Sequence, residues 1–228
     1  MDAMMITLSP AEGRDLLNGV LTILVRKKFP VNYRGWVYVC IKNDKKYQLQ
    51  KVFSVGRREY FYTLERTKEC SLNGKVVARF WCDKVENIKW HKDTAIDLDY
   101  YKVVNVIENK EILKASCLQL KELEDYLQIK NAKNIPTTWG ITFNLGYAIH
   151  ITSLGRFKGL RELKDFAKPM PKNDFICLNC PHYWTDDSAG YSIDKCGLDA
   201  CEKLQLKQVP KTYCYIETPS TYTWLEEK

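Results

Sequence analysis

Four of the nine cysteines in this chain lie close together in its last quarter, at a spacing typical of a metal site. Cys177 and Cys180 form a C-x2-C pair, and Cys196 and Cys201 form a C-x4-C pair after a spacer of 15 residues. Zinc prefers four thiolate or imidazole ligands in a tetrahedron, and four thiolates leave no position for water. The spacing therefore predicts structural zinc. Two alternatives remain open: His182 replaces one cysteine, or the four are free thiols that oxidise in pairs.

The other five cysteines are scattered and are interpreted as small buried apolar side chains: Cys40, Cys70, Cys82, Cys117 and Cys214. A disulfide-rich exported protein would be shorter and would carry an export signal, and this sequence shows no signal peptide. It also has no apolar run near the roughly 18 residues of a membrane span. We therefore expect a protein of the reducing cytoplasm that has no membrane partner.

Positive charge is in modest excess, with 35 basic against 28 acidic residues and a formal net charge of +7. This excess favours RNA, another nucleic acid or a nucleotide as partner, although solvated lysines can produce the same value. Aromatic residues are interleaved with basic ones between residues 42 and 62, a pattern that suits unpaired bases. Strand aromatics are also common in protein cores. The expected contact residues are Arg26, Lys28, Arg57 and Arg58.

The sequence predicts a helix over residues 10–18, before Arg26. Ser9 is a good N-cap, Pro10 suits the first helical position, and Glu12 completes a capping box. Asn18 and Gly19 then form a stop signal.

Further elements follow from apolar periodicity and turn signals. Ser116 and Gln119 form a second capping box, which predicts a helix over residues 117–129, and a short helix is expected near 160–166. Residues 42–72 are interpreted as a long hairpin or surface excursion. Strands are expected at 22–28, 36–41, 75–82, 145–151 and 212–217. Because helices and strands do not alternate regularly, this pattern predicts a mixed α+β fold.

Four stretches resemble the ASCH domain family of the PUA-like superfamily. "LNGVLTILVRKK" at 17–28 resembles its first-strand motif, in which Gly-x-Lys-Thr-Ile-(Glu or Thr)-x-Arg follows a helix. "GKVVARF" at 74–80 resembles its "GKVVGEF" strand, and "GYAIHI" at 146–151 resembles its "GYAWHI" strand. "VPKTYCYI" at 209–216 resembles its closing "PPQSWCYV". The resemblance covers about residues 4–217.

A subgroup of that family, common in Firmicutes and their phages, carries a cysteine knuckle before the last strand. "CLNCPHYW" and "CGLDACEK" resemble its two halves. The resemblance implies a small PUA-like mixed β-barrel with flanking helices, spanning residues 1–174 and completed by a strand at 209–218. The knuckle at 175–204 would be inserted before that strand, and 219–228 would form a tail.

The chain departs from the family motif at two polar positions, where it has Leu21 and Leu24. In hydrolytic members a lysine and its polar partner carry the chemistry, which leucine cannot perform. We therefore expect no catalytic residues by the family route, although Glu86, His150 or Lys28 are alternatives. Arg26 remains, either to hold a phosphate or to form an internal ion pair.

The resemblance implies recognition of RNA or nucleotides, and the two leucines favour binding without catalysis. Two alternatives remain open. The protein could hydrolyse RNA or a modified nucleoside with other residues, or it could bind and inhibit a host defence complex through an apolar patch at the former pocket mouth.

Overall fold

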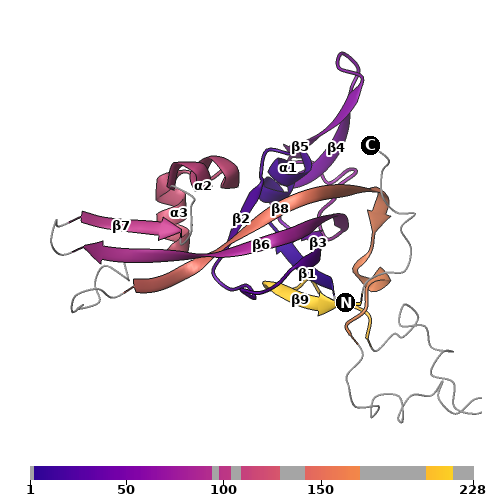
Figure 1. Cartoon of the computed structure of the whole chain (residues 1–228). Coiled ribbons are helices and arrows are strands. Elements are labelled where there is room, and N and C mark those ends of the chain that lie inside the picture. The colour runs from indigo at the N-terminus through magenta and orange to yellow at the C-terminus, as the bar shows by residue number, and fades with distance from the viewer. Residues whose placement is uncertain (1–2, 94–97, 104–108, 129–141, 170–203, 218–228) are drawn as a thin grey trace, which may run out of the picture.

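The fold is a mixed α+β arrangement dominated by one sheet, as predicted (Figure 1). The structure is a computed structural model that describes residues 3–93, 98–103, 109–128, 142–169 and 204–217. Its elements are β1 (Ala3–Leu8), α1 (Pro10–Leu17), β2 (Ile23–Arg26), β3 (Gly35–Ile41), β4 (Gln48–Ser54), β5 (Glu59–Glu65), β6 (Val76–Asp93), β7 (Leu98–Val103), α2 (Asn109–Ser116), α3 (Leu120–Leu127), β8 (Thr142–Arg161), η1 (Leu163–Asp165) and β9 (Tyr213–Ile216).

The main sheet has the strand order β2-β8-β6-β3-β1-β9, and β7 pairs with the far end of β6. Among the described strands of this sheet, only β1 and β3 pair in parallel, and the other pairings are antiparallel. No pairing among the described strands joins β2 to β9. These strands therefore form an open, twisted sheet and not the closed ring of a barrel.

Helix α1 forms as its capping residues predict. The Ser9 amide donates to the Glu12 carboxylate at 2.8 Å, and the Glu12 amide donates to the Ser9 hydroxyl at 3.3 Å. These bonds satisfy two groups that a helix N-terminus otherwise leaves unpaired. The helix ends at Asn18, and Gly19 takes a φ of 75°, which favours glycine.

The sheet is buried on both faces near its centre. Along β1, Met4 and Ile6 belong to one apolar cluster with α1, whereas Met5 belongs to another with Phe166 and Ile216. This division follows from the period of two along a strand. A third cluster joins Ile23, Val25 and Ala148 of the sheet to the helices through Ile112, Leu123 and Leu127.

Strands β6 and β8 are much longer than the predicted strands at 75–82 and 145–151. Their mutual pairing shifts register at four places, including the step from Cys82 to Val85. Such bulges break the alternation of apolar and polar residues, which is the signal that marks a strand in a sequence. The short helix expected near 160–166 is confirmed in part: β8 continues to Arg161, and a 3-10 helix, η1, follows at Leu163–Asp165.

The second capping box was placed one turn too early. Ser116 ends α2, and α3 begins after Gln119, whose amide donates to the Glu122 carboxylate at 2.9 Å. The third position after Ser116 is Gln119, and the third position after Gln119 is Glu122. Because both Gln and Glu suit a capping box, the sequence allowed both starts. The helix expected over 117–129 is confirmed for Leu120–Leu127, and Leu123 and Leu127 on it are buried.

In the part of the chain that the structure describes, no helix has the length and apolar character needed to cross a membrane.

Candidate functional site

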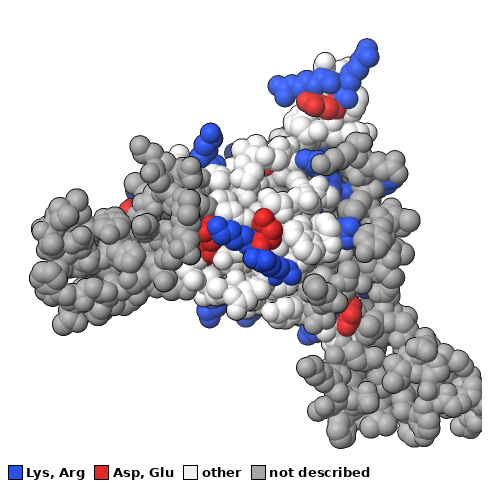
Figure 2. All heavy atoms as spheres, in the orientation of Figure 1, with Lys and Arg blue, Asp and Glu red and all other residues white. Residues whose placement is uncertain are grey.

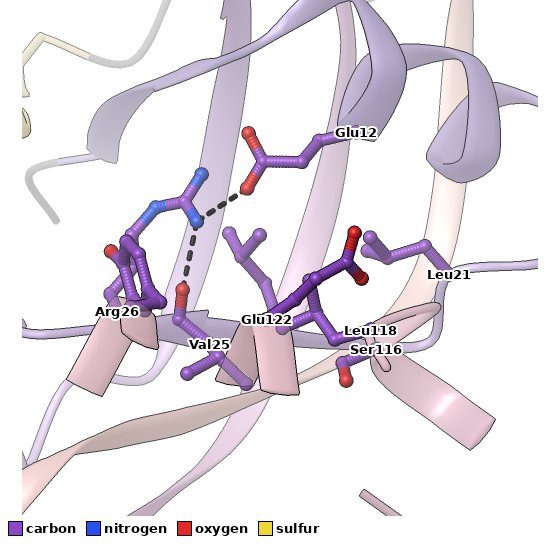
Figure 3. A pocket seen from close by; sticks show the side chains of 9 residues that line it. Glu12, Leu21, Val25, Arg26, Ser116, Leu118 and Glu122 are labelled. Atoms are coloured by element: carbon purple, nitrogen blue, oxygen red, sulfur yellow. Dashed lines mark hydrogen bonds and ion pairs between the residues drawn. The ribbon is translucent and has the colours of Figure 1, made fainter. Parts of the chain in front are cut away.

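Arg26 leaves the end of β2 and points back toward α1 (Figure 3). Its Nη1 lies 2.7 Å from the Glu12 carboxylate and donates to the carbonyl of Val25 at 2.8 Å, while Nη2 donates to the carbonyl of Thr7 at 3.2 Å. Only 12% of its side chain is exposed. The guanidinium thus forms the internal ion pair that was one of its two expected roles.

The electrostatics of this pair favour ionised Glu12. Burial opposes the charge, but the nearby Arg26 cation and hydrogen bonds from Arg26 and Ser9 outweigh that effect. The pKa of the Glu12 carboxyl therefore lies below its ordinary value. A phosphate approaching Arg26 would meet this carboxylate, which already neutralises the guanidinium.

A cavity of about 250 Å³ lies beside this ion pair, between β2, α1 and the α2–α3 helices (Figure 3). Leu21 and Leu24, which stand where this chain differs from the motif it resembles, both line the cavity. They are 3% and 1% exposed. The described residues that line it are Glu12, Leu21, Leu24, Val25, Arg26, Ser116, Leu118, Glu122 and Tyr126. The two leucines thus form apolar wall without filling the space.

Two polar residues of this lining were not predicted from the sequence to be site residues. Ser116 was interpreted only as a helix cap, and Glu122 was not singled out. They come from the α2–α3 junction, nearly a hundred residues after β2. No local pattern in the sequence could have placed them beside Leu21, because their proximity results from packing of the helices on the sheet.

Two of the three residues considered as substitute catalytic groups lie together. His150 Nε2 lies 2.7 Å from one oxygen of Glu86, and the Lys84 ammonium lies 2.7 Å from the other. Glu86 is 4% exposed. Its two partners offset the cost of burying its charge. This group does not line the cavity. Lys28, the third residue considered, is exposed beyond β2.

The stretch expected to be a hairpin or surface excursion is the two-stranded hairpin of β4 and β5, which projects away from the main sheet (Figure 1). At its root, Leu49 and Tyr62 belong to the main core. Farther out, Phe53 pairs with Tyr60, and their side chains are 48% and 61% exposed. Phe61, on the opposite face of the hairpin, is 39% exposed. The tip therefore carries aromatic rings that the fold does not bury.

Cations accompany these rings. Lys51 places its ammonium 4.5 Å from the centre of the Tyr60 ring. Arg57 and Arg58 form the turn, and Arg58 adopts a left-handed φ of 56°. The Arg57 side chain is 80% exposed, with its nearest acidic partner, Glu59, at 4.0 Å. Figure 2 shows lysine and arginine atoms gathered at the end of this projection.

The hairpin root is fixed to α1 by one side chain. The Asn18 amide donates to the carbonyl of Tyr62 at 2.9 Å and accepts from its amide at 3.0 Å. Asn18 thereby pairs with the outer backbone edge of β5 as a neighbouring strand would.

The structure does not bring the four expected contact residues into one site. Arg57 and Arg58 lie at the hairpin tip, whereas Arg26 and Lys28 lie at the end of β2 in the body of the protein (Figure 1). Of these four residues, only Arg26 lines the cavity.

The four expected zinc ligands, Cys177, Cys180, Cys196 and Cys201, lie outside the described residues. Among the residues that are described, no cluster of three or more histidine, cysteine or acidic side chains could hold a metal. Burial raises the pKa of the Cys40 thiol to about 12 and that of Cys82 to about 11, as expected for packed, neutral thiols. The interpretation of Cys70 as buried was wrong, because it lies exposed in a loop with a φ of 54°.

Comparison with known proteins found no match to a family model, to a curated protein or to a solved structure. The functional argument therefore rests on the geometry of the hairpin and the cavity.

Proposed function

We propose that this protein is a non-catalytic, ASCH-type nucleic-acid-binding protein that uses the β4–β5 hairpin to hold single-stranded RNA. The observation that carries the proposal is the hairpin tip, where exposed rings and cations project together into solvent. Arginines bind phosphates, and exposed rings stack on unpaired bases. Phe53, Tyr60 and Phe61 are positioned for such stacking, with Arg57 and Arg58 beside them.

The absence of hydrolysis in this proposal rests on the cavity wall. Leu21 and Leu24 stand where the family motif has its reactive polar residues, and neither can move a proton or attack a substrate. Glu86 and His150 pair with each other away from the cavity. Arg26 is engaged by Glu12.

The PUA-like kinship is part of the same proposal. It is supported by the places where the motif segments lie. The segment at 17–28 runs from the end of α1 into β2, and the segment at 74–80 enters β6. The segment at 146–151 lies within β8, and the segment at 209–216 includes β9. β2, β6 and β8 are also neighbours in the sheet.

The proposal is tested by fluorescence anisotropy with a labelled single-stranded RNA. Replacing both arginines of the tip, Arg57→Glu and Arg58→Glu, should weaken binding at least tenfold. It should also reduce the slope of log affinity against log salt by about 1.4, because each phosphate contact contributes about 0.7 on a single strand. The RNA should remain intact on a gel in the same mixtures.

A matched control carries the same change in net charge away from the hairpin, by Arg34→Glu and Lys207→Glu, both at exposed positions. It should bind nearly as well as the parent protein. Equal losses in the two double variants would show that only net charge matters, and RNA cleavage above that of a heat-inactivated sample would overturn the non-catalytic assignment.

A further inference from the structure

The cavity beside β2 has an unusual balance of polar groups. Glu12 and Arg26 neutralise each other across 2.7 Å, and their remaining hydrogen bonds go to Ser9 and to backbone carbonyls. Among the described lining residues, the charge that remains is the carboxylate of Glu122, an exposed residue. One oxygen of this group accepts from the amide of Gln119. Figure 3 shows the Glu122 carboxylate extending toward Leu21.

Ser116 supplies a second unusual group. Its residue is 4% exposed, and its hydroxyl has no hydrogen-bond partner among the described residues. A buried polar group without a partner costs about 1–3 kcal/mol. Ser116 also lines the cavity, but less than 1 Å² of its hydroxyl oxygen is exposed. A bound molecule that displaces the neighbouring atoms slightly would supply the missing hydrogen bond.

The rest of the lining is apolar. Leu21, Leu24, Val25 and Leu118 form walls, and Tyr126 adds an aromatic ring. The Lys27 ammonium lies 5.4 Å from the centre of the Tyr126 ring. Lys27 itself is not among the lining residues. The volume of about 250 Å³ corresponds to roughly eight water molecules at about 30 Å³ each. A small organic molecule fits this space.

We propose that this cavity binds a small organic amine, in which an apolar or aromatic group carries one positive charge. The apolar part would contact the leucine walls, and the ammonium would pair with Glu122 and hydrogen-bond to Ser116. A phosphate or carboxylate is disfavoured, because Glu122 repels it and Arg26 already has an anionic partner. This site is separate from the hairpin, so the inference does not rest on nucleic-acid binding.

Three probes of similar shape test the charge preference in the full-length protein: 2-phenylethylamine, 2-phenylethanol and 3-phenylpropionate. Titration calorimetry should give the order amine, alcohol, carboxylate, with at least tenfold between the first and the last. Chemical-shift changes should cluster on β2 and the α2–α3 junction. Hairpin variants should bind the amine unchanged, so loss of RNA binding and loss of amine binding are distinguishable.

Two variants test the contacts. Glu122→Gln should weaken amine binding about fivefold, whereas Glu124→Gln, the same charge change on the same helix but outside the cavity lining, should not alter it. Ser116→Ala should weaken amine and alcohol alike without lowering the thermal midpoint. The proposal fails if the carboxylate binds as tightly as the amine, if Glu124→Gln matches Glu122→Gln, or if none of the probes binds at millimolar concentration.

Discussion

Arg26 shows how one residue can suggest ligand binding from sequence and serve the fold in the structure. Its strand position and guanidinium chemistry suit a phosphate, yet its donors go to Glu12 of α1 and to backbone carbonyls of β1 and β2. Three elements, β1, β2 and α1, are thereby joined at one cation.

Replacing Glu12 by Gln should lower the free energy of unfolding by about 2 kcal/mol at pH 7, because Arg26 loses its charged partner. The sign of the pH dependence follows from the lowered pKa of Glu12. The carboxylate stabilises the fold above its unfolded pKa of about 4.3, and this contribution is lost as pH falls through the folded pKa. The gap between parent and variant should therefore narrow below about pH 4, as measured by urea unfolding.

The control for this experiment is Glu69→Gln at an exposed position. Its unfolding free energy should stay within about 0.5 kcal/mol of the parent. A Glu12→Gln deficit that did not change with pH would contradict a role for the carboxylate charge.

At the scale of elements, the hairpin is buried and hydrogen-bonded where it leaves the core and exposed where it ends. Asn18 lies in the turn after α1, so the same residue that ends the helix also fixes the hairpin. The orientation of the tip thus depends on a contact 44 residues apart in the chain.

Asn18→Ala should remove both hydrogen bonds to Tyr62 and destabilise the protein by about 1–2 kcal/mol. Hydrogen exchange followed by mass spectrometry should show faster exchange over residues 59–65 than in the parent. Asn32→Ala, at an exposed loop position, provides the control. Unchanged exchange in β5 would mean that the apolar root alone fixes the hairpin.

Local signals in the sequence predicted the elements that depend on local chemistry. The Ser9 capping box and the Gly19 stop both rest on contacts within a few residues. The lengths of β6 and β8 could not be predicted, because bulges between distant partners set them. The cavity could be anticipated only on its β2 side, since Ser116 and Glu122 reach it through tertiary packing.

At the scale of the whole molecule, the four clustered cysteines predict one zinc ion per chain. Metal analysis of the purified protein by plasma emission should give about one equivalent, because thiolates at this spacing complete a tetrahedral shell. Cys177→Ser and Cys201→Ser should each reduce that content strongly. Cys70→Ser, which changes an exposed thiol outside the cluster, should not. Less than about half an equivalent in the parent protein would contradict the zinc assignment.

The place of β1 in the sheet also has a consequence for biosynthesis. This strand lies between β3 and β9, and Ala3 pairs with Ile216. After making β1, the ribosome must add about two hundred residues before β9, its second partner, exists. Until then, the backbone edge of β1 and the apolar side chains of Met5 and Ala3 have no cover from β9, which favours association with other chains. Completion of the sheet is thus a late event in the life of each nascent chain, and its long-range pairing favours slow folding.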